Sequence, residues 1–285
     1  MAVTRLFESG STSVIDYRCE ATPHDKPFAE HYSAFSLSFV RKGSFTCLSR
    51  GRTGELVAGA FLVGYPGDEY TCSHDHHAGG DECLSFQWTA EAVDRVGASR
   101  HWQSMSVPPV AELMVVGELA QATAEGKSDF SLDEIGVRLM LRYAELVSDV
   151  KWATGKVQAH TCRRMIDAAT RIRECSHQPL SLDVMASWTD LSSFHFLRSF
   201  TKVLGLTPHQ YLIRCRLRNA ARLLSDRDRP ITQIALDVGF DDLSNFVRTF
   251  HRAAGVSPRD FRSLAKADQE SSAVAGRLAL ASRGA

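Results

Sequence analysis

The sequence has few features of a membrane protein or a disulfide-bonded protein. Its 285 residues contain no uninterrupted apolar run near the roughly 20 residues that span a bilayer, and residues 1–10 lack the basic-then-apolar order of a signal peptide. The seven cysteines are scattered and include no Cys-x-x-Cys pair, which favours reduced thiols over a disulfide framework or a zinc knuckle. We therefore expect a cytoplasmic protein without a membrane partner.

The usual fingerprints of catalysis are also missing from the sequence. It contains no phosphate-cradling glycine loop, no nucleotide-binding fingerprint and no recognisable nucleophilic triad. We therefore expect neither enzymatic activity nor a cofactor.

Charge is unevenly distributed although the net charge is zero. Residues 1–150 contain 12 basic and 21 acidic residues, whereas residues 151–285 contain 21 basic and 12 acidic residues. A basic domain can bind a polyanion because neutralised phosphates release counterions, although a solvated charged face is the alternative. With 44% hydrophobic residues and this length, the chain is expected to form two domains, one acidic and one basic.

The acidic half is predicted to begin as a β-domain and to end in helices. From residue 34 to residue 88, short apolar stretches such as Phe35–Val40 and Cys83–Trp88 are separated by Gly and Asp, which is typical of a sandwich or barrel. Leu132–Val147 then has apolar residues every three or four positions, and Ser131 with Glu134 forms a capping box before it. This apolar stripe packs on its own domain or forms a subunit interface. We expect a homodimer that uses Leu139 and Tyr143 of this stripe.

The basic half contains an internal repeat at an offset of 50 residues. The matching pairs include Phe196/Phe246, Arg198/Arg248, Phe200/Phe250, Gly205/Gly255 and Pro208/Pro258. Each copy has a short apolar helix, a turn and a second helix, so the sequence predicts two helix-turn-helix motifs. Gly239 is expected to give the second turn its left-handed backbone, and Ser192 to cap the second helix of the first copy.

The second helix of each copy should carry an outward polar face. Ser, Asn, Arg and His on such a face suit base reading in the major groove, because Arg pairs with guanine and Asn with adenine. An ordinary solvated surface, or packing against a neighbouring helix for the apolar members, is the alternative. The predicted DNA-binding residues are Ser193, Phe194, Leu197, Arg198, Lys202, Ser244, Asn245, Arg248 and His251.

The basic half resembles the DNA-binding domain of the AraC/XylS family of bacterial transcription regulators. The resemblance covers about Val157 to Arg262 and is carried by Gly205–Leu224, Ile231–Phe240, Asn245–Phe250 and Gly255–Arg262. It implies seven helices, with Thr207–Leu224 holding the two reading helices about one DNA turn apart. It also implies double-stranded DNA and RNA polymerase as partners. The first copy departs from the family pattern at Asp190, where a small residue is usual, but Asp tolerates a left-handed turn.

The acidic half is similar to the cupin-type barrel with which many family members sense a small-molecule effector, and Gly59–Gly67 resembles a strand and turn of such barrels. The expected fold class is α+β: an N-terminal cupin-like β-barrel with helices and a C-terminal all-α domain with two helix-turn-helix motifs. The expected domains are an effector-binding and dimerisation domain in residues 1–150, a linker in 151–160 that permits independent folding, a double helix-turn-helix domain in 161–264 and a disordered tail in 265–285.

One loop of the acidic half is rich in metal-ligating residue types. Within fifteen positions the chain places Glu69, Cys72, His74, Asp75, His76, His77, Asp81, Glu82 and Cys83. The loop could bind a transition metal through His74, His76, Glu82 and Cys83, act as a lid over an effector pocket, or be a solvated polar loop. The spacing does not fit the usual cupin metal motif, so no metal is assigned.

Two functions of different classes remain. The first is a sequence-specific DNA-binding transcription regulator, activator or repressor, that responds to a small-molecule effector. The second is a metal-dependent cupin enzyme with helical decoration. The 50-residue repeat favours the regulator, because an enzyme has no use for two reading helices at this separation.

Overall fold

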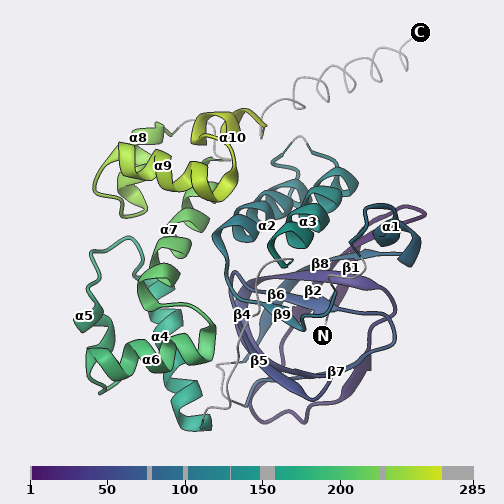
Figure 1. Cartoon of the computed structure of the whole chain (residues 1–285), viewed down its shortest axis with the longest axis horizontal. Helices are drawn as coiled ribbons and strands as arrows, with labels where there is room; N and C mark the ends of the chain where they lie inside the picture. The colour runs from purple at the N-terminus through teal and green to yellow at the C-terminus, as the bar shows by residue number, and fades with distance from the viewer. Residues whose placement is uncertain are drawn as a thin grey trace.

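The computed structural model describes residues 2–75, 79–98, 102–128, 130–147, 158–224 and 229–264. These residues form an N-terminal β-domain with three helices and a C-terminal domain made of helices alone (Figure 1). The fold class expected from the sequence, α+β with the β-barrel first and the helix-turn-helix motifs last, is confirmed. Among the described helices none is both long and apolar enough to cross a bilayer.

All strand pairs of the N-terminal domain are antiparallel. One layer has the order β1-β2-β8-β4-β6-β9, and the other joins β3, β7, β4 and β5. The strands are β1 (Ala2–Glu8), β2 (Thr12–Cys19), β3 (Ala29–His31), β4 (Phe35–Ser49), β5 (Arg52–Val57), β6 (Phe61–Gly64), β7 (Glu69–Ser73), β8 (Asp81–Trp88) and β9 (Ser106–Val107).

Strand β4 connects the two layers. Its first part pairs with β6 and β8, and its second part pairs with β5 and β7. The register with β8 shifts between Val40 and Lys42, which leaves Arg41 as a bulged residue. A bulge bends a strand and increases its twist, so this position lets one strand pass from one layer to the other.

Helix α3 (Leu132–Val147) begins and ends at the predicted residues, and the Ser131 hydroxyl caps it by accepting a hydrogen bond from the Glu134 backbone N–H at 3.4 Å. Its apolar stripe is buried inside its own domain. Leu139 and Tyr143 are fully buried, and the Tyr143 ring lies 4.8 Å from that of Trp102. The prediction that this stripe forms the subunit interface is therefore wrong, because the barrel already covers it.

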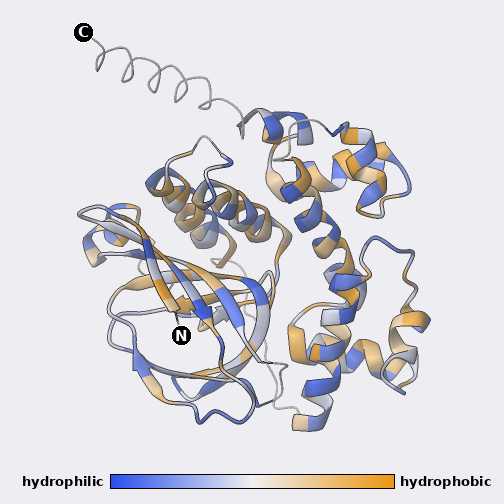
Figure 2. Cartoon of the chain, turned by 180° about the vertical axis from the view of Figure 1, so that it is seen from behind, coloured by the Kyte–Doolittle hydropathy of each residue, from blue (hydrophilic) through white to orange (hydrophobic). Residues whose placement is uncertain are grey.

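The C-terminal domain has seven helices in its described part, as the resemblance implied, and they carry both hydrophobic and hydrophilic residues (Figure 2). They are α4 (Ala159–Glu174), α5 (Leu182–Ser187), α6 (Ser193–Leu204), α7 (Pro208–Leu224), α8 (Ile231–Asp237), α9 (Leu243–Ala254) and α10 (Pro258–Leu264). Helix α4 begins within the predicted linker, of which residues 151–157 lie outside the described residues. The predicted tail, residues 265–285, also lies outside them.

The two domains pack against each other through α2 (Ala111–Ala124), which contacts α3 on one side and α7 and α9 on the other (Figure 1). One continuous hydrophobic cluster includes Leu113 and Leu119 of α2, Phe86 of the barrel, and Leu217 and Phe250 of the C-terminal domain. A helix buried nearly all round has no polar face to expose. The halves are thus joined by a shared core, and not only by the linker that was expected to separate them.

Candidate nucleic-acid interface and ligand cavity

Two helix-turn-helix units lie at the two ends of α7 (Figure 1). The first is α5–α6 and the second is α8–α9. The predicted cap at Ser192 is confirmed, because its hydroxyl accepts a hydrogen bond from the His195 N–H at 3.4 Å. In the second unit Asp242 caps α9 by accepting a hydrogen bond from the Asn245 N–H at 2.7 Å. Each cap fixes the first turn of a reading helix.

Both turns use a left-handed residue. Asp190 has φ +48° and Gly239 has φ +97°, as expected for these two positions. A Cβ atom on Gly239 would lie 2.9 Å from Arg216 Nε and 2.9 Å from the His177 carbonyl oxygen. Glycine is required there for its backbone conformation and for the close approach of α7.

Aromatic side chains hold each reading helix to the domain in the same way. Phe200 of α6 packs on Tyr211 with ring centroids 5.8 Å apart, and Phe250 of α9 packs on Phe261 at 5.3 Å. Both phenylalanines are fully buried. The sequence repeat is therefore a structural repeat, and it orients the two reading helices by equivalent contacts.

The predicted reading residues lie mostly on the surface. Phe194, Arg198 and Lys202 of α6 are exposed, while Ser193 and Leu197 are half-buried. On α9 the whole predicted set is exposed: Ser244, Asn245, Arg248 and His251. Their role in reading bases stays a prediction.

Phe194 is the most exposed large apolar side chain of α6, with 62% of its surface accessible. The Arg198 guanidinium lies 5.5 Å from the centroid of its ring, within cation–π range. The alternative that Phe194 is simply covered by a neighbouring helix does not fit this exposure. An exposed ring next to an arginine on one reading face suits contact with a base and its phosphate.

A buried ion pair joins the acidic domain to the connecting helix. Arg218 Nε of α7 donates to the Glu118 carboxylate of α2, and the two side chains are 4% and 2% exposed. Arg222 Nε lies 3.3 Å from the other Glu118 oxygen but is 58% exposed. Burial lowers the pKa of the Arg218 guanidinium, and the charge and hydrogen bond of Glu118 more than offset this, so the pKa is raised overall.

The same arginine binds the barrel directly. Arg218 Nη2 donates to the carbonyl oxygen of Arg41, the bulged residue of β4. The Arg41 guanidinium in turn donates to Asp16 of β2 and, at 3.0 Å, to Gln121 Oε1 of α2. A network of charged hydrogen bonds therefore connects β2, β4, α2 and α7 at a single place.

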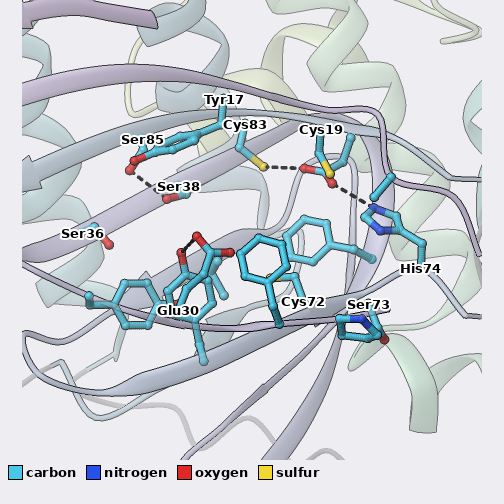
Figure 3. A pocket seen from close by; sticks show the side chains of 18 of the residues that line it. Tyr17, Cys19, Glu30, Ser36, Ser38, Cys72, Ser73, His74, Cys83 and Ser85 are labelled. Atoms are coloured by element: carbon cyan, nitrogen blue, oxygen red, sulfur yellow. Dashed lines mark hydrogen bonds and ion pairs between the residues drawn. The ribbon is translucent and has the colours of Figure 1, made fainter. Parts of the chain in front are cut away.

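The interior of the barrel contains a cavity of about 630 Å³, a volume within the usual range for small-molecule sites. Polar side chains line it at both ends, with Ser38 and Ser85 at one and His74 at the other (Figure 3). Ser38 Oγ donates to Ser85 Oγ at 2.9 Å, and Tyr70 Oη donates to Glu30 Oε2 at 3.2 Å. Burial, with the Glu30 carboxylate second, raises the pKa of the Tyr70 hydroxyl, which therefore remains a donor at neutral pH.

One hydroxyl of this cavity lacks a partner among the described residues. Tyr32 stacks on Tyr70 with ring centroids 4.1 Å apart, and its Oη is buried without a hydrogen bond. A buried polar atom without a partner is unfavourable by roughly 1–3 kcal/mol. A ligand with a polar group at this position would remove that penalty.

The metal-ligand candidates are only partly brought together. His74 is buried, and its Nε2 lies 3.0 Å from Asp81 Oδ2. The buried thiol of Cys83 donates to Asp81 Oδ1 at 3.4 Å. Burial, followed by the nearby Asp81 charge, raises the pKa of the Cys83 thiol, which keeps it protonated.

Glu82 does not belong with them. Side chains alternate along a strand, so Glu82 points away from the cavity and contacts Lys42 at 3.3 Å and Arg41 at 3.8 Å. The candidate role of Glu82 as a ligand beside His74 is therefore wrong. His76 lies outside the described residues.

Sequence reasoning missed three important side chains of the acidic half. Cys19 lies at the end of a strand, Thr12–Cys19, that was not predicted, and Tyr32 precedes the predicted β-region. Glu118 gave a signal that could have been used: it is one acidic residue inside the apolar run Leu113–Ala120. An acidic residue at a buried helix position requires a charged or hydrogen-bonding partner.

Comparison with known proteins places the similarity mainly in the C-terminal domain. A family model described as a helix-turn-helix domain matches residues 185–263. The MmsAB operon regulatory protein of Pseudomonas aeruginosa is 33% identical over 91 residues, which cover 32% of this chain and 30% of that protein. The melibiose operon regulatory protein of Escherichia coli is 35% identical over 95 residues, which cover 33% of this chain and 32% of that protein.

A longer match reaches into the N-terminal domain. An uncharacterised HTH-type transcriptional regulator of Bacillus subtilis, YisR, is 22% identical over 254 residues, which cover 82% of this chain and 87% of that protein. The chain spans about a third of the length of the first curated relatives that it matches.

Proposed function

The chain carries a double helix-turn-helix domain of the AraC/XylS family, and from this premise we propose that the whole protein is a sequence-specific DNA-binding transcription regulator that responds to a small-molecule effector. The observation that carries the proposal is the pair of equivalent units, α5–α6 and α8–α9, whose exposed faces bear Arg198 and Arg248. Each face would enter a major groove, with α7 setting their separation.

The effector would bind in the barrel cavity. The hydroxyl groups that line the cavity, including the unpaired Tyr32 Oη, support a polar small molecule as the ligand. The cavity wall reaches the domain interface through two strands: Cys83 and Asp81 of β8 pair with Val40 and Gly43 of β4, on either side of the bulge at Arg41. A ligand that shifts β8 against β4 would therefore move the carbonyl oxygen that Arg218 binds. Such a ligand regulates only if it binds the two arrangements with different affinity.

The proposal includes two protein partners. RNA polymerase is the expected target of a regulator that binds next to a promoter. A second copy of the chain is the other partner, because Val137 and Leu141, on the outer face of α3, are 42% and 44% exposed and lie one helical turn apart.

The test of base reading compares specific and random DNA. DNA that the full-length protein binds would be selected from a random duplex library, and affinities would be measured for the selected sequence and for a scrambled one. Arg248→Ala and Asn245→Ala should each weaken binding to the selected sequence by roughly 1–3 kcal/mol, about 5- to 150-fold, and change binding to scrambled DNA much less.

The matched control is Arg95→Ala in α1 (Ala90–Arg95), which removes one positive charge from an exposed arginine of the barrel domain. It should leave both affinities unchanged. If Arg248→Ala weakened binding to selected and scrambled DNA by the same factor, Arg248 would be a phosphate contact and not a base-reading residue. If the full-length protein selected no sequence at all, the proposed function itself would be rejected.

A further inference from the structure

Three side chains with metal-ligating atoms meet at one end of the barrel cavity. Cys19 ends β2 and Asp81 begins β8, and the two residues are directly paired across the strands. His74 follows the end of β7. One donor atom from each of these residues lies within 4.8 Å of the other two (Figure 3 labels Cys19 and His74). They come from three strand ends, and although His74 and Asp81 are only seven positions apart in the sequence, Cys19 lies 55 positions before His74.

The backbone around this cluster is closely packed. The Gly80 N–H donates to the Ala21 carbonyl oxygen at 2.8 Å, which joins the chain after β2 to the chain before β8. A Cβ atom on Gly43 of β4 would lie only 2.1 Å from the Gly80 carbonyl oxygen. Three backbone segments therefore meet too closely for the cluster to be an accidental crossing of long surface side chains. A rigid support of this kind keeps ligand atoms in place before a metal arrives.

From this geometry we propose that Cys19, His74 and Asp81 form a binding site for a thiophilic divalent metal ion of the Zn²⁺ class. One thiolate, one imidazole and one carboxylate are a donor set that zinc accepts, with bond lengths of roughly 2.0–2.3 Å and neighbouring donor atoms roughly 3.3–3.8 Å apart. Calcium and magnesium prefer sites made of oxygen atoms alone. The site goes beyond DNA binding and does not depend on it.

The hydrogen bonds of the cluster fit this role. The metal would replace the hydrogen bond between His74 Nε2 and Asp81 Oδ2, which lie 3.0 Å apart. The proton of that bond would move to Nδ1 of a neutral imidazole or leave an imidazolium for solvent, and the Cys19 thiol proton would also leave to solvent. The Cys83 thiol, which donates to Asp81 Oδ1 at 3.4 Å, would keep that carboxylate in place from the side opposite the metal. In metal sites, hydrogen bonds of this kind orient the residues that bind the metal directly.

The charge of the cavity also favours a cation. Its lining includes four carboxylates, from Glu20, Asp25, Glu30 and Asp81, but one lysine, Lys26. Three protein ligands leave a fourth tetrahedral position, as in zinc sites that bind an exchangeable ligand. That position would be available to a donor atom of a molecule in the cavity.

Cobalt substitution tests the proposal directly. The full-length protein, stripped with a chelator and kept reduced, would be titrated with Co²⁺ and then with Zn²⁺. We expect one equivalent of Co²⁺ to give a thiolate-to-cobalt charge-transfer band with tetrahedral d–d bands, and Zn²⁺ to abolish both. Cys19→Ser should lose the charge-transfer band, and Asp81→Asn should weaken binding about tenfold or more. Cys72→Ser, which alters a thiol that lines the same cavity outside the cluster, should keep the spectrum.

A second measurement needs no variant and so does not depend on whether Cys19→Ser folds. Zn²⁺ should protect Cys19 from alkylation by iodoacetamide, while Cys175, which is also half-buried but lies in the C-terminal domain, should react at the same rate with and without the metal. The proposal is overturned if the unaltered protein gives no charge-transfer band, if Cys19→Ser retains it, or if Zn²⁺ leaves Cys19 alkylation unchanged. None of these readouts involves DNA, so they succeed or fail independently of the proposed regulatory function.

Discussion

The buried pair of Glu118 and Arg218 offers the sharpest test of how the two domains are held together. Replacing Glu118 by Gln keeps the volume of the side chain but removes its charge. Arg218, which is 4% exposed, would then lose the carboxylate that it binds and would keep the neutral Arg41 carbonyl oxygen as an acceptor. A buried charge without a countercharge is strongly unfavourable.

The magnitude follows from this burial. Removing one partner of a buried ion pair destabilises a protein by about 3–5 kcal/mol. In a chain of this size, each kcal/mol lowers the melting temperature by roughly 2–4 °C, so Glu118→Gln should lower it by roughly 6–20 °C. Adding Arg218→Met should restore much of this loss, because two neutral side chains leave no buried charge. Arg222→Ala is the control: Arg222 also contacts Glu118, but it is 58% exposed, and its loss should change stability by about 0–1 kcal/mol.

The assay is calorimetry of the four proteins at equal concentration, supported by urea unfolding followed by circular dichroism. A single transition in the unaltered protein is expected, because one hydrophobic cluster includes residues of both domains. If Glu118→Gln unfolded at the same temperature as Arg222→Ala, the pair would contribute no more than a surface ion pair. The buried ion pair of Glu118 and Arg218 would then not hold α2 and α7 together.

Two further predictions concern the second turn and the subunit interface. In urea unfolding, Gly239→Ala should destabilise the protein by more than Gly255→Ala. Both glycines have a left-handed backbone, so each alanine should lower the free energy of unfolding by about 1–2 kcal/mol for that reason alone. A Cβ atom at Gly239 would also lie 2.9 Å from neighbouring atoms, whereas at Gly255 it would have no neighbour within 4 Å among the described residues. Equal losses would contradict this reading of the turn. Replacing Val137 and Leu141 by lysine should give monomers of unchanged stability in sedimentation, whereas Leu139→Lys should unfold the barrel domain; a dimer that survives the double change would rule out the outer face of α3 as the interface.

The helical half could be predicted well from the sequence because its determinants are local. The helical spacing inside each copy of the repeat, the cap at Ser192 and the left-handed turn at Gly239 each depend on residues a few positions apart, and the structure confirms all three. Helical contacts between positions three and four apart are visible in a sequence. The outward faces followed from the same periodicity.

The barrel half resisted prediction because its contacts join distant segments. Cys19 and Asp81 are 62 positions apart and meet because β2 and β8 pair in one register. Neither segment alone indicates that register. The stripe through Leu139 and Tyr143 was correctly located but assigned to the wrong partner, since periodicity shows that a face is buried and not what covers it. Glu118 and Arg218 are 100 positions apart and belong to different domains, so neither segment alone indicates its partner.

Helix α2 also limits how either domain could be exchanged for that of another protein. If this barrel were joined at residues 151–160 to the helical domain of another protein, Leu113 and Leu119 would lose the surface that now covers them. Glu118 would then face a helix without the arginine that it binds here. A functional chimera would need an arginine at the position of Arg218 and a small, apolar surface around Ala220. The exposed faces of α6 and α9 can therefore change without altering this interface, whereas the surface that meets α2 must change together with the barrel domain.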